Sequence, residues 1–223
     1  MASRMTDTAP LAHVELFASF TPDEMARLAA AAERRGLQRG DVLFSEHEEA
    51  DALYVVTQGR IAIATQSVDG RESVMALMER GDLFGEMPLF DGLGRSAQAR
   101  ALEVSSVLEI PYDPLRHIYA GRPALLWGVV KLLAGRLRNT DAALADSVFL
   151  DVTGRTAKRL LELAGPAEEF ALPITQEELA GMVGASRERV NKAIASFIRL
   201  GWIEQRDRRY SITNRPELQH RAR

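Results

Sequence analysis

The 223-residue chain contains no cysteine. Disulfide frameworks, thiolate nucleophiles and cysteine-ligated zinc or iron–sulfur sites are therefore excluded by chemistry. Long hydrophobic runs are missing too: no eighteen consecutive apolar residues occur, and the N-terminus lacks the basic-then-apolar pattern of a signal peptide. We expect a cytoplasmic protein that does not bind a membrane.

Residues suited to metal binding or catalysis are also scarce. The four histidines, at positions 13, 47, 117 and 220, lie far apart and show no ligand spacing. The acidic run at 45–49 falls in a turn between strand patterns and is expected to be solvated. No metal or haem is predicted. Because no nucleophile–base pair or nucleoside-triphosphate loop is recognisable, we expect a protein that is not an enzyme.

The charge of the chain is unevenly distributed. The formal net charge is -3. Residues 1–149 hold 15 basic and 21 acidic side chains, whereas residues 186–223 hold 10 basic and 4 acidic ones. A basic C-terminal stretch is what a DNA-binding element needs to neutralise phosphates, although a solvated tail would show the same charge.

The N-terminal half carries two different patterns. Residues 14–35 are expected to be helical, with a cap at Thr21 and proline at the first turn. From Gly36 to Tyr112, short runs with a period near two alternate with glycine or acidic turns. This spacing predicts a jelly roll or barrel of many short antiparallel strands.

A long helix is predicted from Pro123 to about Ser147. Its apolar stripe follows steps of four and three residues, which is the seam of a coiled coil. The stripe consists of Leu126, Val130, Leu133, Leu137, Thr140, Leu144 and Ser147. A homodimer is the simplest way to bury it, and the alternative is that it packs only on the chain's own strands.

Two helices joined by a glycine turn are predicted over residues 175–201. Thr175 and Glu178 have the spacing of a capping box, and Gly184 permits the turn. A second cap then opens a helix from Arg187 to Leu200, and residues 202–213 form a hairpin with a basic tip. Short helix, turn and long helix make up a DNA-binding arrangement.

The outward residues at the start of the second helix have the chemistry of base recognition. Arginine donates two hydrogen bonds to guanine, glutamate accepts from cytosine, and lysine reaches guanine or phosphate. The alternative is a solvated polar face on an ordinary helical hairpin. The predicted DNA-binding residues are Ser186, Arg187, Glu188, Arg189, Asn191 and Lys192.

The run TQEELAGMVGASRERVNKAIASFIRLGWI resembles the winged helix-turn-helix of the Crp/Fnr superfamily, in particular the actinobacterial cyclic-AMP receptor type. The resemblance implies that Arg187, Glu188 and Lys192 occupy base-reading positions for two-fold symmetric, TGTGA-like sites. Lysine stands where many members have arginine, and Arg189 replaces the usual threonine. Both departures affect the expected preference at the outer bases.

A second segment, FGEMPLF followed by RSA, carries ligand chemistry. A glycine allows close backbone approach, amides at the start of a turn face an anion, and an arginine clamps a phosphate. Alternatively, Glu86 and Arg95 form a surface salt bridge. The segment resembles the phosphate-binding cassette of cyclic-nucleotide-binding domains. That resemblance implies that Arg95 and Ser96 hold the phosphate, that Glu86 accepts from the ribose 2'-OH, and that Gly85 and Met87 give backbone and ribose contacts.

The predicted nucleotide site comprises Gly85, Glu86, Met87, Arg95, Ser96, Ala97, Arg136, Thr140 and Asp141. The family resemblance implies that Thr140 and Asp141 contact the adenine from the long helix. Asp141 replaces the usual serine or asparagine, and its carboxylate would also suit the amino group of guanine. Arg136 either contacts the nucleotide or pairs with an acidic neighbour, and we expect the pairing.

The prediction is therefore a mixed α+β protein. Residues 1–122 form a cyclic-nucleotide-binding β-roll, 123–150 a dimerisation helix and hinge, and 151–223 a winged helix-turn-helix. The predicted function is a cyclic-AMP-responsive homodimeric transcriptional regulator whose partners are double-stranded DNA and RNA polymerase. One alternative keeps this fold but acts without cyclic AMP or senses another effector such as cyclic GMP. Another makes the β-roll a regulatory module of an enzyme.

Overall fold

A computed structural model describes residues 9–68, 72–172, 174–207 and 209–223. The chain divides into two compact units, one built from Met1–Thr65 and Met75–Arg136 and the other from Gln66–Val74 and Leu137–Arg223. Within the described residues, every helix is too short or too polar to cross a membrane. The same residues contain no cluster of three or more side chains arranged to hold a metal ion.

Short antiparallel strands form two four-stranded sheets, as the period-two pattern predicted. Their orders are β1-β8-β3-β6 and β2-β7-β4-β5. The bounds are β1 Glu33–Leu37, β2 Val42–Phe44, β3 Ala52–Gln58, β4 Ile61–Gln66, β5 Glu72–Met78, β6 Leu83–Phe84, β7 Gln98–Ala101 and β8 Ser105–Pro111. Alternate residues of β7 and of much of β8 are buried, which places one face of each strand on the core.

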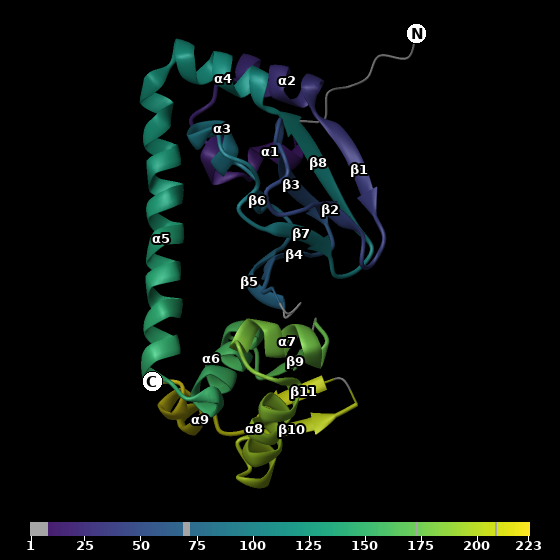
Figure 1. Ribbon diagram of the computed structural model, residues 1–223, viewed down its shortest axis with the longest axis vertical. Coiled ribbons are helices and arrows are strands. Elements are labelled where there is room, and N and C mark those ends of the chain that lie inside the picture. The colour runs from purple at the N-terminus through teal and green to yellow at the C-terminus, as the bar shows by residue number, and fades with distance from the viewer. Residues whose placement is uncertain (1–8, 69–71, 173, 208) are drawn as a thin grey trace. The chain divides into compact units, whose positions relative to one another are not determined.

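The helices of the first part of the chain lie before β1, between β6 and β7, and after β8. They are α1 Ala9–Ala12, the 3-10 turn η1 Glu15–Phe17, α2 Pro22–Ala31, α3 Met87–Asp91, α4 Tyr112–Gly121 and the 3-10 turn η2 Pro123–Leu125. Helices α2 and α4 pack against each other (Figure 1). The Thr21 cap of α2 is confirmed, because its hydroxyl accepts from Glu24 N and the Glu24 carboxylate accepts from Thr21 N.

The prediction of one helix over residues 14–35 is wrong at both ends. Residues 15–17 form a single 3-10 turn, because Leu16 and Phe17 are drawn into the core as neighbours rather than at helical spacing. Glu33 begins β1, where it pairs with Glu109 of β8, so the sheet satisfies backbone groups that a helix would otherwise have satisfied. Only Pro22–Ala31 is α-helical within that range.

Helix α5, Leu126–Phe149, follows η2 and confirms the predicted long helix. Val129, which is buried, and Leu132, which is partly buried, place one face of α5 on the core of the first unit, next to the buried Leu125 of η2. The predicted seam lies on a different face. Leu137 and Leu144 on that face keep 62% and 64% of their surface exposed in the single chain. Within the first unit, Leu126, Val130 and Leu133 of the seam also stay 36–51% exposed, so the strands of that unit do not bury them.

A break in the helix at Leu150 separates α5 from the C-terminal part of the second unit. Its elements are α6 Val152–Ala164, β9 Glu169–Ala171, α7 Gln176–Val183, α8 Arg187–Arg199, β10 Ile203–Arg206, β11 Arg209–Ile212 and α9 Arg215–Arg221. The three strands form a small antiparallel sheet ordered β10-β11-β9. The helices of this part of the chain supply a buried core that includes Leu160, Leu179, Val190, Ile194, Phe197 and Leu218. Helix α9, which was not predicted, closes this core against α6.

Candidate functional site

Glu86 is the second residue after β6 and directly precedes the first residue of α3. Its side chain is completely buried. One carboxylate oxygen, Oε1, accepts a hydrogen bond from Arg136 Nη1, while Nη2 of the same arginine donates to Leu83 O at 2.7 Å. The other oxygen, Oε2, is buried and has no partner among the described residues. A buried acceptor of this kind is costly unless a donor reaches it.

Arg95 lies in the loop between α3 and β7 and is only 3% exposed. Its Nη1 donates to Gly85 O at 3.0 Å and to the Tyr112 hydroxyl at 3.2 Å, and its Nη2 donates to Ala52 O at 2.9 Å. The guanidinium carbon stands 4.1 Å from the centre of the Phe44 ring, a cation–π distance. The Nε atom is buried and lacks a partner within the described part of the chain.

Gly85 lets these groups approach each other. Its φ is +77°, and a Cβ atom there would stand 2.7 Å from Arg95 Nη1. Any side chain at this position would therefore be strained and would push the guanidinium away. Among the other cassette residues, the exposed Ser96 hydroxyl donates to Met87 Sδ at 3.6 Å, and Ala97 is buried. Met87 and Ser96 thus lie beside each other at the surface.

The hypothesis of a surface salt bridge between Glu86 and Arg95 is contradicted, because both side chains are buried and Glu86 pairs with Arg136 instead. The expectation that Arg136 pairs with an acidic neighbour is confirmed. Tyr112, the first residue of α4, was missed as a member of this cluster. Nothing in the sequence singles it out, since Arg95 and Tyr112 are brought together by the fold across 17 residues.

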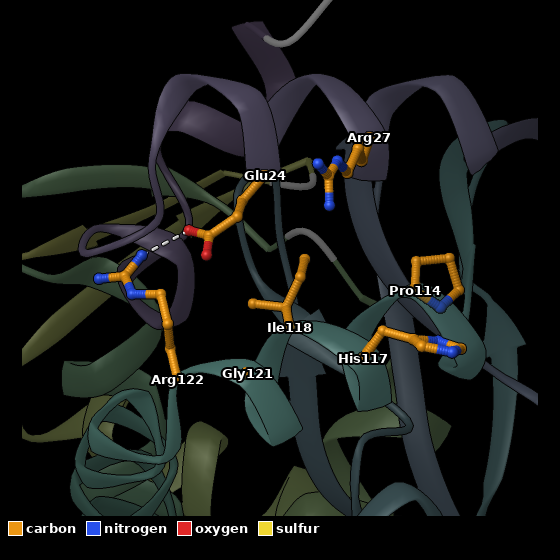
Figure 2. Close-up of a pocket in the computed structure, with 7 residues that line it drawn as sticks. All are labelled: Glu24, Arg27, Pro114, His117, Ile118, Gly121 and Arg122. Atoms are coloured by element: carbon orange, nitrogen blue, oxygen red, sulfur yellow. Dashed lines mark hydrogen bonds and ion pairs between the residues drawn. The ribbon is translucent and has the colours of Figure 1, made fainter.

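The remaining predicted nucleotide residues lie in the second unit. Thr140 and Asp141 occupy consecutive positions on α5, and both are exposed. A hollow elsewhere in the first unit contains none of the predicted residues. This groove of about 430 Å³ lies between α2 and α4, and Figure 2 shows Glu24 and Arg122 paired on one side of it.

The predicted helix-turn-helix is formed as expected. The Thr175 hydroxyl accepts from Glu178 N at 3.2 Å, and Glu178 Oε2 accepts from Thr175 N at 2.7 Å, which completes the capping box of α7. Gly184 ends that helix with a φ of +67°. The Ser186 hydroxyl then accepts from Arg189 N and caps α8. These are the local features that set the position of the second helix.

Five of the six predicted DNA-binding residues are exposed at the beginning of α8: Ser186, Arg187, Glu188, Arg189 and Lys192. Lys192 Nζ stands 2.7 Å from Glu188 Oε1, and this hydrogen bond and charge lower the pKa of Glu188. Asn191 differs from the expectation of an outward residue. It is half-buried, and its Oδ1 lies beneath the surface because this position adjoins the inward Val190 and Ile194.

Comparison with known proteins identifies both halves of the chain. Residues 34–122 match the cyclic nucleotide-binding domain family, and residues 154–221 match the Crp-like helix-turn-helix domain family. The chain is 38% identical to the CRP-like cAMP-activated global transcriptional regulator of Mycobacterium tuberculosis over 220 residues, which covers 96% of this chain and 98% of the relative.

Solved structures show the same fold. FixK2 of Bradyrhizobium japonicum superposes with a TM-score of 0.77 at 23% identity, covering 85% of this chain and 96% of FixK2. The c-di-GMP responsive global regulator CLP of Xanthomonas campestris gives 0.74 at 26% identity, covering 86% and 99%. Both domain families match, and the 38% identity extends over nearly the whole chain. The chain therefore belongs to the Crp family of transcriptional regulators, with a cyclic-nucleotide-binding domain followed by a DNA-binding helix-turn-helix.

Proposed function

We propose that the protein is a homodimeric transcriptional regulator that binds cyclic AMP and, in response, binds palindromic TGTGA-like DNA sites. The observation that supports this proposal most strongly is a pair of buried polar atoms that lack hydrogen-bond partners among the described residues. Glu86 Oε2 is a buried acceptor and Arg95 Nε a buried donor, and neither has a partner among the described residues. A sugar hydroxyl would satisfy the first and a phosphate oxygen the second.

In this proposal the cassette holds the sugar phosphate. Arg95 and Ser96 bind the phosphate, Glu86 accepts from the ribose 2'-OH, and Gly85, Met87 and Ala97 supply close backbone and neighbouring contacts. Arg136 remains on Oε1 of Glu86 and keeps the carboxylate oriented. Thr140 and Asp141 of α5 are proposed to contact the adenine.

The long helix is proposed to carry the dimer. Its a/d stripe leaves Leu137 and Leu144 more than 60% exposed, and a second copy would cover them. Residues 123–150 would then act as the dimerisation helix and hinge between a ligand domain at 1–122 and a DNA domain at 151–223. Nucleotide binding would alter the packing of the two helices and so the spacing of the two α8 helices, which must enter major grooves about 34 Å apart.

The exposed residues at the start of α8 are proposed to contact the DNA. Arg187 and Glu188 would contact base edges, Arg189 and Ser186 the backbone, and Lys192 a guanine or a phosphate. The half-buried Asn191 would help to hold the helix rather than lead the contact. RNA polymerase is proposed as the protein partner of the DNA-bound dimer.

Calorimetry tests the ligand. Cyclic AMP should bind the wild-type protein saturably, and Glu86→Gln and Arg95→Lys should each weaken binding at least tenfold, because each loses one charged contact worth about 1.5–3 kcal/mol. Glu103→Gln, which changes a half-exposed carboxylate outside the cassette, is the matched control and should bind normally. The absence of saturable binding to wild type would refute the ligand assignment.

DNA binding is tested separately. Replacing Arg187 and Glu188 together by alanine should abolish preference for TGTGA-type palindromes while cyclic AMP affinity stays at the wild-type value. Arg199→Ala, at the opposite end of α8, is the control, because Arg199 is exposed there and donates to Ser196 on its own helix. Full palindrome binding by the double variant would overturn the assignment of α8 as the base-reading helix.

A second candidate effector is a guanine nucleotide. Asp141 motivates it, because a carboxylate accepts hydrogen bonds from the amino group of guanine. The structural similarity to a regulator described as c-di-GMP responsive, at 26% identity, points the same way. Competition of cyclic GMP and cyclic di-GMP against labelled cyclic AMP decides between them: displacement at lower concentration than cyclic AMP itself would favour the guanine effector.

A further inference from the structure

The geometry points to Tyr112 as a positioning residue, whose hydroxyl holds the Arg95 guanidinium so that one edge stays free for a phosphate. This inference rests on the proposed nucleotide site and names a residue that lies behind it. Tyr112 itself does not contact the ligand in this arrangement. It acts through Arg95 and through the Gly85 carbonyl, both of which its hydroxyl touches.

The hydrogen bonds of Arg95 define which edge is free. A guanidinium carries five N–H groups. Nη1 donates to Gly85 O and to the Tyr112 hydroxyl, and Nη2 donates to Ala52 O. The Nε–H has no partner among the described residues, and it lies on the same edge of the guanidinium as Nη2. These two are adjacent in the planar fork and match two oxygens of one phosphate. The protein therefore satisfies one side of the guanidinium and leaves the phosphate-binding side unpaired.

The Tyr112 hydroxyl is placed to do this. It donates to Gly85 O at 2.5 Å and accepts from Arg95 Nη1 at 3.2 Å. The hydroxyl therefore links the backbone at Gly85 to the guanidinium of Arg95. Burial raises the pKa of Tyr112 to about 12, and the hydroxyl therefore keeps its proton at neutral pH. The backbone of Tyr112 is also held in place, since Tyr112 N donates to Asp51 O at 2.7 Å, and the residue is only 1% exposed.

A purely structural role would have a different signature. The Tyr112 ring fills the core beside Leu115, and the Phe44 ring supports the flat face of Arg95 without any help from the hydroxyl. If only the ring mattered, replacing tyrosine by phenylalanine would leave ligand affinity unchanged. If the hydroxyl positions Arg95, the same replacement weakens ligand binding, and it does so only while Arg95 is present to be positioned.

The test is a double-mutant cycle measured by calorimetry with cyclic AMP. Tyr112→Phe should weaken binding about tenfold in the wild-type background, the size of one hydrogen bond to a charged group. In the Arg95→Lys background the same change should alter affinity less than twofold, because lysine has no fork to orient. The matched control is Tyr119→Phe on the same helix, whose buried hydroxyl has no partner among the described residues and should leave affinity unchanged.

The NMR signal of the Arg95 Nε–H gives a readout that core packing does not supply. It is assigned by its disappearance in Arg95→Lys and should shift when cyclic AMP is added to wild type or to Tyr119→Phe. In Tyr112→Phe the shift should be smaller at equal occupancy. Equal affinity of Tyr112→Phe and wild type, or an equal loss in both backgrounds, would overturn the inference while leaving the proposed function intact. Failure of wild type to bind cyclic AMP would overturn both.

Discussion

Arg136 of helix α5 donates to the buried carboxylate of Glu86, fifty residues earlier in the chain. The second nitrogen of the same guanidinium donates to Leu83 O, so one side chain joins the long helix both to β6 and to the residue that precedes α3. The carboxylate proposed to bind the ribose is thus held by the helix proposed to carry the dimer. In the proposed site, a change in the sugar contact would therefore reach α5 through the charge-assisted hydrogen bond between Glu86 and Arg136.

Arg136→Ala should destabilise the protein by about 1–3 kcal/mol. Removing one partner of a buried ion pair leaves the other charge unpaired and typically costs about 3–5 kcal/mol of stability. We expect a smaller loss of stability here because Arg136 is itself one-third exposed. Urea denaturation followed by circular dichroism measures the change. Arg138→Ala, an exposed arginine on the same helix, serves as the control. Equal stability of the two variants would show that the pair contributes nothing.

Disrupting the seam should separate the subunits. Leu137→Glu combined with Leu144→Glu places charges on the exposed apolar stripe, where two copies would repel, and sedimentation should show a monomer that no longer binds palindromic DNA. Ala142→Glu, an exposed position off the stripe, should remain dimeric. A wild-type protein that sediments as a monomer, or a double variant that still sediments as a dimer, would contradict the proposed interface.

Stability should fall in acid through Asp151. A hydrogen bond from Gly154 N and the charge of Arg221 lower the pKa of this helix-capping carboxyl, so its stabilising effect is present above about pH 4 and is lost as the pH falls through the lowered pKa. Asp151→Asn keeps a cap but loses the charge. Wild type should be more stable than this variant at pH 7, by no more than about 1 kcal/mol for so exposed a pair, and should match it near pH 2. A constant difference from pH 7 to pH 2 would argue against the carboxylate effect.

Asp141→Ser should raise the preference for cyclic AMP over cyclic GMP. The carboxylate accepts from the guanine amino group, whereas a serine hydroxyl can also donate to adenine. The ratio of the two dissociation constants, measured by competition, should change by about three- to tenfold, as expected for one hydrogen bond. Asp146→Ser, nearer the C-terminal end of the same helix, is the control. An unchanged ratio in Asp141→Ser would remove this residue from the base-binding site.

The sequence was most informative where local rules decide the structure. Thr175 and Glu178 fixed the start of α7, Gly184 its end, and the inward spacing of Val190 and Phe197 the face of α8. Each is set by residues within one or two turns of each other. The long helix was equally predictable, because its apolar steps extend over many turns.

Long-range features were not predictable in this way. Strand β6 is only two residues long and α9 only seven, too short for any periodicity to be visible. Residues 33–35 form a strand because they pair with residues 107–109 of β8, which lie far away in the sequence. The cassette residues were identified from their chemistry, but the three acceptors that hold Arg95, above all Tyr112, were determined by folding.

The most direct test of the account is the linkage between nucleotide and DNA. Affinity for a fluorescent TGTGA-type palindrome should be measured by anisotropy at fixed salt while cyclic AMP is increased. We expect DNA affinity to rise by about 5- to 150-fold, which corresponds to a coupling of about 1–3 kcal/mol, and cyclic AMP affinity to rise by the same factor when DNA is saturating. DNA affinity that stays constant from zero to saturating cyclic AMP would contradict the proposed function.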